Sequence, residues 1–432
     1  MNKNKSTFKG GYYFHKFQGI PSTVLAEAPI PSIVRFSVTP NSQILIKEGD
    51  VVEAGQKIAE NPVIISSVYG KVSTISPYIE IKAENKNGFI SLQREKTNWE
   101  ELSCDELWTQ LKESGILNLG LLEKDSIKAV VVSAFNTHPC AMNVQGWIQD
   151  KMDALVTGIK ILCKIYPEIH FYIACSIKDK SFYNDLLVET SSISQVSVHA
   201  LKPKYPQELG EILLETLTGN VIPDGKEITD LGYCSLNIED FIYIYEAIVE
   251  KKPFIEKIIS LEGTGYKTNQ ALKVRLGTPL LEIYEKWHIE NCETRMLDGN
   301  ALTGNIVNEK SFVTATTRTT TCIKEDRKRR FLFFLRPGLR DDSLSRTFLS
   351  YFLPVAHSVD TNIHGEERPC VQCGYCESVC PRHLLPNLMH RYCSHDMEEE
   401  AIAIRMNACI NCKLCSYVCP SKITKNFRKD RD

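Results

Sequence analysis

The chain lacks any long apolar run and any strong excess of one charge. No stretch approaches the roughly 18 to 20 apolar residues that cross a bilayer. Lys and Arg (51) nearly balance Asp and Glu (53), so the formal charge is only −2 and nothing indicates nucleic acid or an acidic substrate as a partner. No apolar segment follows the lysines of the first residues, so a secretory signal is not expected. We therefore expect a cytoplasmic protein with no transmembrane segment of its own.

Two common phosphate-binding motifs are also missing. The sequence contains neither G-x-G-x-x-G nor G-x-x-x-x-G-K followed by Ser or Thr. The stretch Ser114–Gly120 has two glycines, but it runs directly into Leu121 and Leu122. A phosphate cradle needs free backbone N–H groups in a glycine-rich turn. The sequence thus offers no evident nucleotide-binding loop.

What the chain does have is an ordinary globular composition with an uneven distribution of cysteine. Apolar residues make up 43% and charged residues 24% of 432 residues, which is typical of folded domains and suggests about three of them. Of the 16 cysteines, seven are scattered over residues 1–369 and nine fall between Cys370 and Cys419. Because a chain of this length without a secretory signal is not expected to be a disulfide scaffold, the cluster indicates a metal site.

The cysteine-rich tail contains one motif twice. Residues 370–381 and 409–420 both read C-x2-C-x2-C-x3-C-P, the spacing of bacterial two-cluster ferredoxins. The first three thiolates of a run can bind three corners of one iron–sulfur cube, and the fourth is placed for the neighbouring cube. We therefore predict two 4Fe–4S clusters with crossed ligation. The predicted ligands are Cys370, Cys373, Cys376 and Cys419 for the first cluster, and Cys380, Cys409, Cys412 and Cys415 for the second.

Other interpretations of these cysteines are weaker. Structural zinc is usually held by two Cys pairs in a tetrahedral site, whereas each run here has three close cysteines and a fourth before Pro. Between the runs, residues 384–404 are expected to be an amphipathic helical segment covering the clusters, and Cys393 within it lacks partner spacing. Cys140 follows His138 and Pro139, but a turn after a strand explains this pair better than a reactive Cys–His site.

Residues 1–98 are expected to form a β domain of the barrel-sandwich hybrid type. Short apolar segments separated by glycine turns give two matching hairpins, at 44–59 and 64–72. The pattern resembles biotinyl and lipoyl carrier domains, whose modified lysine lies at a hairpin tip. Lys71 follows Gly70 but lacks the Met or acidic neighbours of a carrier lysine. A structural module is therefore the preferred interpretation.

The remaining chain divides into three parts. Residues 99–255 alternate expected strands with expected helices, which predicts a Rossmann-like parallel α/β core. Residues 256–322 are expected to be a β-grasp domain of the soluble-ligand-binding type. Residues 323–432 are expected to be a linker followed by the two-cluster ferredoxin-type helical domain. A basic run at 324–330 is interpreted as a solvated turn, with docking on a membrane partner as the alternative.

Taken together, the parts resemble the A subunit of the Na+-translocating NADH:quinone oxidoreductase and its relative, the C subunit of the Rnf ferredoxin:NAD+ oxidoreductase. The paired cysteine motifs and the opening Phe8–Gly11 with His15 and Lys16 are similar to the Rnf subunit. The quinone-reductase subunit is matched by the segments Phe331–Gly338, Ser345–Ser350 and Gly365–Pro369. The resemblance implies the domain order given above.

One departure from the family bears on cofactors. The Rnf subunit has a glycine loop for flavin and NADH and then an acidic stretch. Here the glycine loop is missing after Gly120, and Ser133–Pro139 stands in place of the acidic stretch. The resemblance, with this departure, implies that the chain binds neither FMN nor NADH tightly.

The resemblance implies an iron–sulfur electron-transfer protein within a membrane-bound, ion-translocating NADH:quinone or Rnf-type oxidoreductase. Such a subunit would lie on the inner face of the cell membrane and would not catalyse alone. Its partners would be the membrane subunits, and further candidates are a quinone or a flavin-bearing subunit. Two alternatives are a stand-alone flavin and iron–sulfur reductase, similar to cobalamin-reducing relatives, and a non-redox assembly scaffold without iron or sulfide.

Overall fold

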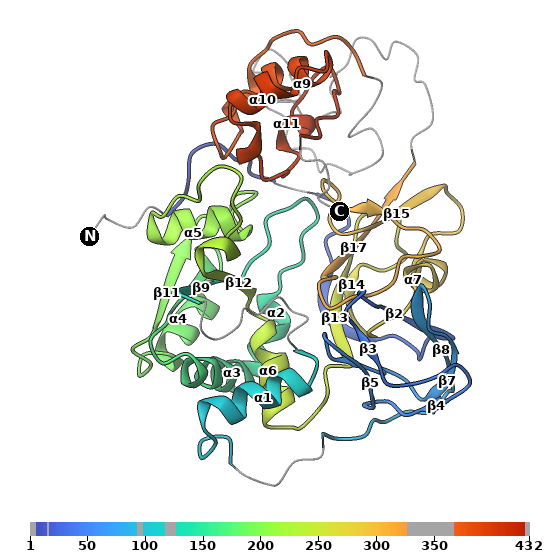
Figure 1. Ribbon diagram of the computed structural model, residues 1–432. Coiled ribbons are helices and arrows are strands. Elements are labelled where there is room, and N and C mark those ends of the chain that lie inside the picture. The colour runs from blue at the N-terminus through green and yellow to red at the C-terminus, as the bar shows by residue number, and fades with distance from the viewer. Residues whose placement is uncertain (1–5, 15–16, 93–97, 117–126, 326–366, 428–432) are drawn as a thin grey trace.

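The computed structural model describes residues 6–14, 17–92, 98–116, 127–325 and 367–427 (Figure 1). Several segments used for the family resemblance lie outside these ranges. They are His15, Lys16, 117–120, Phe331–Gly338, Ser345–Ser350 and the first two residues of Gly365–Pro369. In the part that is described, the chain is a mixed α/β molecule with four sheets. No described helix has the length and apolar character that would let it span a membrane.

The central α/β region is built on four parallel strands, as predicted. The strand order is β11-β10-β9-β12. The strands are β9 (Ala129–Ser133), β10 (His170–Ser176), β11 (Val196–Leu201) and β12 (Tyr233–Asn237). The helices are α1 (Cys104–Glu113), α2 (Gln145–Ile148), α3 (Met152–Ile165), α4 (Lys180–Glu189), α5 (Gly210–Thr218) and α6 (Asp240–Ile248), with short 3-10 helices at Gln149–Lys151 and Thr229–Leu231.

Both faces of this sheet are covered by helices. Along β9, Val130 and Val132 belong to the main core together with residues of α3 and α6, whereas Val131 belongs to a second core with Leu213 and Leu214 of α5. Alternate side chains of a strand point to opposite faces, so a run of valines fills both. The sequence pattern therefore places helices on the two sides of the sheet (Figure 1).

The β-rich part of the molecule contains three sheets. The largest has the order β1-β14-β13-β17-β15-β16, and the smaller antiparallel sheets have the orders β2-β8-β7-β4 and β3-β5-β6. The strands are β1 (Ser22–Glu27), β2 (Ile33–Ser37), β3 (Gln43–Ile44), β4 (Val51–Val52), β5 (Lys57–Glu60), β6 (Ile64–Ile65), β7 (Gly70–Thr74), β8 (Tyr78–Ala83), β13 (Glu256–Glu262), β14 (Gln270–Arg275), β15 (Thr294–Asp298), β16 (Asn305–Ile306) and β17 (Thr319–Lys324), with helix α7 at Leu280–Trp287. Strand β1 pairs in parallel with β14, so an N-terminal strand is part of the sheet formed by the third region.

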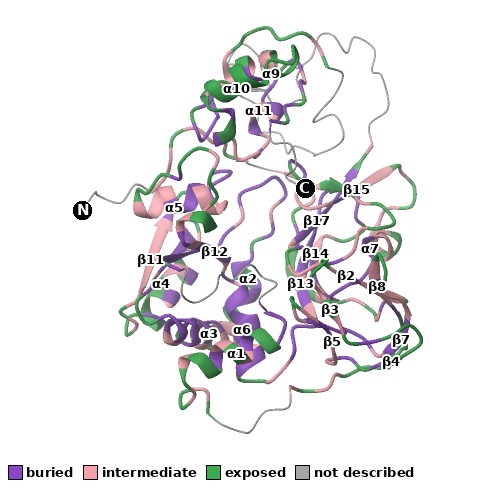
Figure 2. Cartoon of the chain, viewed as in Figure 1, coloured by how far each residue is buried: buried purple, intermediate pink, exposed green. Residues whose placement is uncertain are grey.

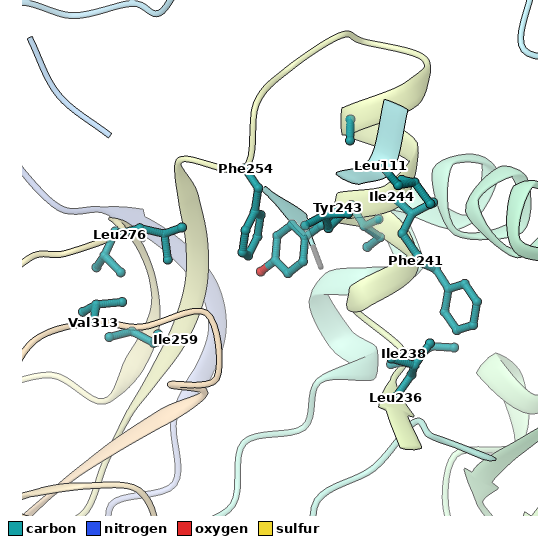
Figure 3. Packing of buried hydrophobic residues seen from close by; sticks show 14 of the residues in the cluster. Leu111, Leu236, Ile238, Phe241, Tyr243, Ile244, Phe254, Ile259, Leu276 and Val313 are labelled. Carbon is teal, nitrogen blue, oxygen red and sulfur yellow. The ribbon is translucent and has the colours of Figure 1, made fainter. Parts of the chain in front are cut away.

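A continuous core joins the α/β region to the β-rich region. Tyr243 of α6 and Phe254 lie with their ring centroids 5.2 Å apart, and the Tyr243 hydroxyl accepts the backbone N–H of Ile258 in β13 at 2.9 Å. Figure 3 shows these two rings between the side chains of α6 and those of Ile259, Leu276 and Val313. The purple, buried ribbon in Figure 2 accordingly runs through both regions.

The C-terminal domain is a small helical unit above the other regions (Figure 1). Its helices are α8 (Tyr375–Ser378), α9 (Pro386–Cys393), α10 (Glu398–Ala403) and α11 (Leu414–Tyr417), with a 3-10 helix at Met406–Ala408. The expected helical segment 384–404 is two helices rather than one, because the chain turns between them with Asp396 at φ 56°. The Arg382 side chain donates to Glu215 of α5 at 3.3 Å, and the Gly11 N–H donates to the carbonyl of Val379 at 2.7 Å, which fixes the domain to the core and to the N-terminal segment.

Candidate iron–sulfur site

The two cysteine runs fold in the same way. Gln372 and Asn411, which are 39 residues apart in the sequence, have φ values of 52° and 54°, and the pair Gly374 and Lys413 has φ values of 74° and 61°. Left-handed residues turn the chain back on itself within one or two positions. Helices α8 and α11 begin directly after these turns, so each run is a tight loop that enters a short helix.

The thiols of each run already receive backbone hydrogen bonds. The N–H of Gln372 donates to Sγ of Cys370, and the N–H of Asn411 donates to Sγ of Cys409, both at 3.4 Å. N–H groups aimed at sulfur stabilise a thiolate and tune a bound cluster. The loops therefore present donors as well as ligands.

Eight of the nine cysteines from Cys370 to Cys419 line two cavities. Each cavity is lined by three cysteines of one run and the last cysteine of the other. The first cavity has Cys370, Cys373, Cys376 and Cys419 in its lining, and the second has Cys380, Cys409, Cys412 and Cys415. These are the two sets brought together by the predicted crossed arrangement. Cys393 lines neither cavity; its Sγ lies 3.6 Å from Sδ of Met406.

The donor set of each cavity is four cysteine thiols, which is the ligand set of a 4Fe–4S cluster. In the described ranges, no three or more His, Cys, Asp or Glu side chains are close enough to share one metal ion. In a tetrahedral zinc site with Zn–S near 2.3 Å, the sulfurs would be about 3.8 Å apart. In a cubane, each thiolate has its own iron, so the four sulfurs surround the group at wider spacing. Four cysteines around a cavity are the arrangement that such a cluster requires.

The two cavities differ in exposure. Cys370 and Cys373 of the first set are exposed, whereas Cys412 of the second set is only 8% exposed. Burial raises the pKa of Cys415 to about 12 and the pKa of Cys412 well above its usual value. The first set thus has two exposed cysteines, Cys370 and Cys373, whereas no cysteine of the second set is exposed.

An aromatic cluster connects the second cavity to the α/β region. The Tyr205 hydroxyl donates to the carbonyl oxygen of Cys412 at 2.8 Å. The ring of Phe14 lies 5.6 Å from that of Tyr205, 5.1 Å from that of Tyr417 and 5.7 Å from that of Phe17. None of these residues has a sequence motif, and only their spatial neighbours identify them. They form packed contacts between the cysteine loops and the core.

Phe14 and Phe17 also line a cavity of about 300 Å³ at the carboxyl ends of β9 and β10. In parallel α/β sheets, ligands usually bind at this edge. His138 lies in the lining, and its Nε2 is 2.9 Å from a carboxylate oxygen of the fully buried Glu262. Burial lowers the pKa of His138, but the charges of Glu262 and Glu208 outweigh burial and raise this pKa to about 10.

His138 and Cys140, which the sequence places at a turn without a reactive role, lie beside this cavity. Cys140 is buried, has φ 64°, and its Sγ lies 3.1 Å from the carbonyl oxygen of Gln18. Burial raises the pKa of this thiol, and the charge of Glu262 raises it further. A protonated, buried thiol is inert, so the geometry agrees with a structural role for Cys140.

Comparisons with known proteins divide the chain in the same way. The family model of the Nuo51 FMN-binding domain matches residues 117–246, and that of a 4Fe-4S dicluster domain matches residues 369–423. The chain thus combines an α/β region similar to an FMN-binding domain with a dicluster iron–sulfur domain. The second match supports the predicted presence of two clusters.

Curated relatives cover most of the chain. The C subunit of an ion-translocating oxidoreductase complex from Buchnera aphidicola is 24% identical over 85% of this chain and 72% of the relative. The C subunit of a proton-translocating ferredoxin:NAD(+) oxidoreductase complex from Clostridium ljungdahlii is 24% identical over 87% and 81%. The A subunit of the Na(+)-translocating NADH-quinone reductase of Histophilus somni is 23% identical over 80% and 79%. The predicted resemblance to both families is therefore confirmed.

Among solved structures, a chain of an NAD+-reducing NiFe hydrogenase in the air-oxidized state matches 53% of this chain at 12% identity, with a TM-score of 0.39. The H2-reduced state of that hydrogenase gives 10% identity and a TM-score of 0.37. The matched part spans about half of the hydrogenase chain.

The expectation that FMN is not bound here is not supported. It depended on a missing glycine loop after Gly120, which lies outside the described residues, and on Ser133–Pro139 standing in place of an acidic stretch. The match to an FMN-binding domain nevertheless covers residues 117–246. A short motif is only one part of a flavin-binding site. The carboxyl edge of the sheet, where ligands usually bind, also has a cavity.

Proposed function

We propose that this chain is the iron–sulfur electron-transfer subunit of a membrane-bound, ion-translocating oxidoreductase of the NADH:quinone or Rnf type. One observation carries the proposal: eight cysteines of a twice-repeated motif surround two cavities, and each cavity borrows one cysteine from the other run. The curated relatives are subunits of such complexes, which supports the assignment. The proposed ligands are the two sets of four named above.

When bound, the two clusters would supply one-electron transfer. The residues of the chain hold the sites next to each other, because Cys380 and Cys419 each belong to one loop and line the cavity of the other. The second cavity contacts the core through Tyr205, and the first is open at Cys370 and Cys373. Val371 between them is 67% exposed. We propose this open side as the face for a redox partner.

The partners and location follow from the same proposal. The chain would act with membrane subunits of its complex and face the cytoplasm on the inner side of the membrane. A quinone or a flavin-bearing subunit would accept or donate the electrons at the open side. The chain would not complete the overall reaction alone, since an electron carrier needs both a donor and an acceptor.

We further propose the domain division expected from the sequence, at 1–98, 99–255, 256–322 and 323–432. The four-stranded parallel sheet supports the second unit. The two small antiparallel sheets, β2-β8-β7-β4 and β3-β5-β6, support a barrel-sandwich hybrid for the first, and the sheet with α7 supports a β-grasp unit for the third. Strand β1 is an addition to the third unit from the first.

The direct test is anaerobic purification of the full chain followed by iron and sulfide analysis. About eight irons and eight sulfides per chain are expected, with paramagnetic signals of two interacting clusters after dithionite reduction. Cys419→Ser should remove the cluster of Cys370, Cys373 and Cys376, leaving about four irons. Cys393→Ser is the matched control and should keep all of the iron. Protein without iron and with about one zinc per cysteine run would contradict the proposal.

A second candidate is a stand-alone flavin and iron–sulfur reductase. The match to an FMN-binding domain and the cavity at the carboxyl edge of the sheet favour it. The two candidates differ in where the flavin resides. Purified chain that retains FMN and reduces a small acceptor with NADH without any other subunit would favour the reductase. Chain that carries iron and sulfide but needs membrane subunits for electron transfer would favour the first proposal.

A further inference from the structure

Lys425 is a buried lysine that faces both cysteine cavities. Its exposed fraction is only 3%, and it is part of the lining of each cavity. Among the residues that the structure describes, no other residue lines both. Lysine is rarely buried without a functional or structural partner, because taking its charge out of water is unfavourable.

The segment around Lys425 is fixed by hydrogen bonds to the cysteine loops. The backbone N–H of Lys425 donates to Oγ of Ser416 at 2.8 Å, and its Nζ donates to the carbonyl oxygen of Cys415 at 3.4 Å. The hydroxyl of Ser421, four residues earlier, donates to the carbonyl of Pro369 at 2.9 Å. The segment therefore touches the beginning of the first run and the helix of the second, with the lysine between them.

The position of Lys425 puts its charge next to thiols of both sets. Cys376 lines the first cavity, Cys415 lines the second, and Lys425 lines both. The partner of Nζ is a carbonyl oxygen, which does not neutralise the charge. A single cation thus lies within electrostatic reach of both sites.

We infer that Lys425 is a shared positioning charge that raises the reduction potentials of both clusters together. The inference rests on the proposed two-cluster function. Reduction adds one electron, and so one negative charge, to a cluster, and a nearby cation in a poorly solvated site stabilises the reduced form. Because the same cation faces both sites, its removal should shift both potentials in the same direction.

The test is an anaerobic redox titration of the full chain, followed by paramagnetic resonance of each cluster. In Lys425→Gln, the equilibrium constant for one-electron reduction should fall about tenfold for each cluster. For a one-electron couple, this fall lowers the reduction potential by about 59 mV. Lys425→Arg keeps the charge and should restore both potentials. Unchanged potentials of both clusters in Lys425→Gln relative to wild type, with iron and sulfide also unchanged, would overturn the inference.

Lys413→Gln is a matched control. Lys413 lines only the second cavity, is half-buried, and its Nζ bonds to Oδ1 of Asn426 at 2.9 Å. Removing its charge should change the second cluster alone, and by less than in Lys425→Gln. Equal shifts of both clusters in Lys413→Gln would mean that overall charge rather than the shared position sets the potentials, which would contradict the inference.

Two outcomes separate this inference from the proposed function. Wild-type protein without clusters would contradict the function itself, whereas loaded wild type with an unresponsive Lys425→Gln would contradict only the role of the lysine. If Lys425→Gln fails to assemble clusters, cluster loading replaces the potential as the readout. Loading in Lys425→Arg but not in Lys425→Gln or Lys425→Met then supports the charge, and failure of all three contradicts it.

Discussion

At the residue scale, glycines next to the cysteine loops determine how closely the N-terminal segment approaches the candidate site. Gly10 has φ 74°, and a Cβ built on it would lie 2.5 Å from the carbonyl oxygen of Cys380. Neither the conformation nor the contact suits a residue with a side chain. The N-terminal segment can therefore lie this close to Cys380 only because residue 10 has no side chain.

Gly10→Ala should loosen this contact. We expect a loss of about 1 to 3 kcal/mol from the left-handed backbone and the clash together. The measurement is the thermal unfolding midpoint of the loaded protein. Gly219→Ala is the control, because Gly219 has φ 79° but a Cβ added there would meet no atom within 4 Å. If both variants lose the same stability, the clash with Cys380 contributes nothing.

His138 should make stability depend on pH. The two glutamates raise the pKa of His138 to about 10 in the folded protein, against 6.5 for an ordinary histidine. The stabilising contribution is therefore complete below about pH 6.5 and is lost as the pH rises through about 10. The difference in unfolding midpoint between wild type and His138→Gln should be largest near pH 6 and shrink toward pH 10. A difference that does not change with pH would rule out a protonated His138.

At the scale of elements, a buried ion network joins α6 to the segment before β17. Arg318 is 2.7 Å from Glu239 and 3.0 Å from Asp240, and Asp240 is 0% exposed. Burial raises the pKa of Glu239, and the charge of Arg318 opposes this rise. The charge of Arg318 thus stabilises two buried carboxylates at the interface between the α/β and β-rich regions.

Arg318→Met should be strongly destabilising, by about 3 to 5 kcal/mol, because it leaves buried carboxylates without their cation. Lys267→Met is the comparison: Lys267 pairs with Glu290 at 2.5 Å, and the two side chains are 45% and 71% exposed, so a loss of about 0 to 1 kcal/mol is expected. Chemical denaturation followed by tryptophan fluorescence measures both. Similar losses of stability in the two variants would show that burial does not increase the contribution of the ion network around Arg318.

At the scale of the whole molecule, the C-terminal domain has a much smaller core than the rest. Its own apolar cluster has seven buried residues, one of them the proposed ligand Cys380, and a second cluster, with Cys412, is shared with Tyr205 and Leu302 of the other regions. Small domains with limited cores are commonly held together by metal centres, whose binding energy is part of the folding energy. The largest core is shared by the α/β and β-rich regions.

Removal of iron should therefore unfold the C-terminal domain selectively. After anaerobic chelation, amide hydrogen exchange should become fast in α8 to α11, while β10 and β13 stay protected. Mass spectrometry of peptides from the exchanged protein measures this. Tyr205→Phe in the loaded protein is a useful companion, since it breaks only the bond to the carbonyl of Cys412. Unchanged exchange in the tail after complete iron loss would contradict a structural role for the clusters.

The sequence by itself determined the chemistry of the tail and the type of the central sheet. The repeated spacing predicts that the first three thiols of each run share a cluster, because one loop and one short helix set their distances locally, and the two-cluster pattern predicts that the fourth comes from the other run. The run of valines in β9 likewise predicts a strand buried on both faces. The family resemblance also came from the residues alone.

Only the tertiary structure decided which distant residues complete the site. Lys425, Tyr205 and Phe14 have no motif. Tyr205 bonds to Cys412, 207 residues away, and Lys425 lines both cavities only because the two cysteine runs fold together. The pairing of β1 with β14 and the cavity beside His138 are of the same kind. Local spacing constrains only neighbours in the chain, whereas burial, charge and contact between remote segments are properties of the packed molecule.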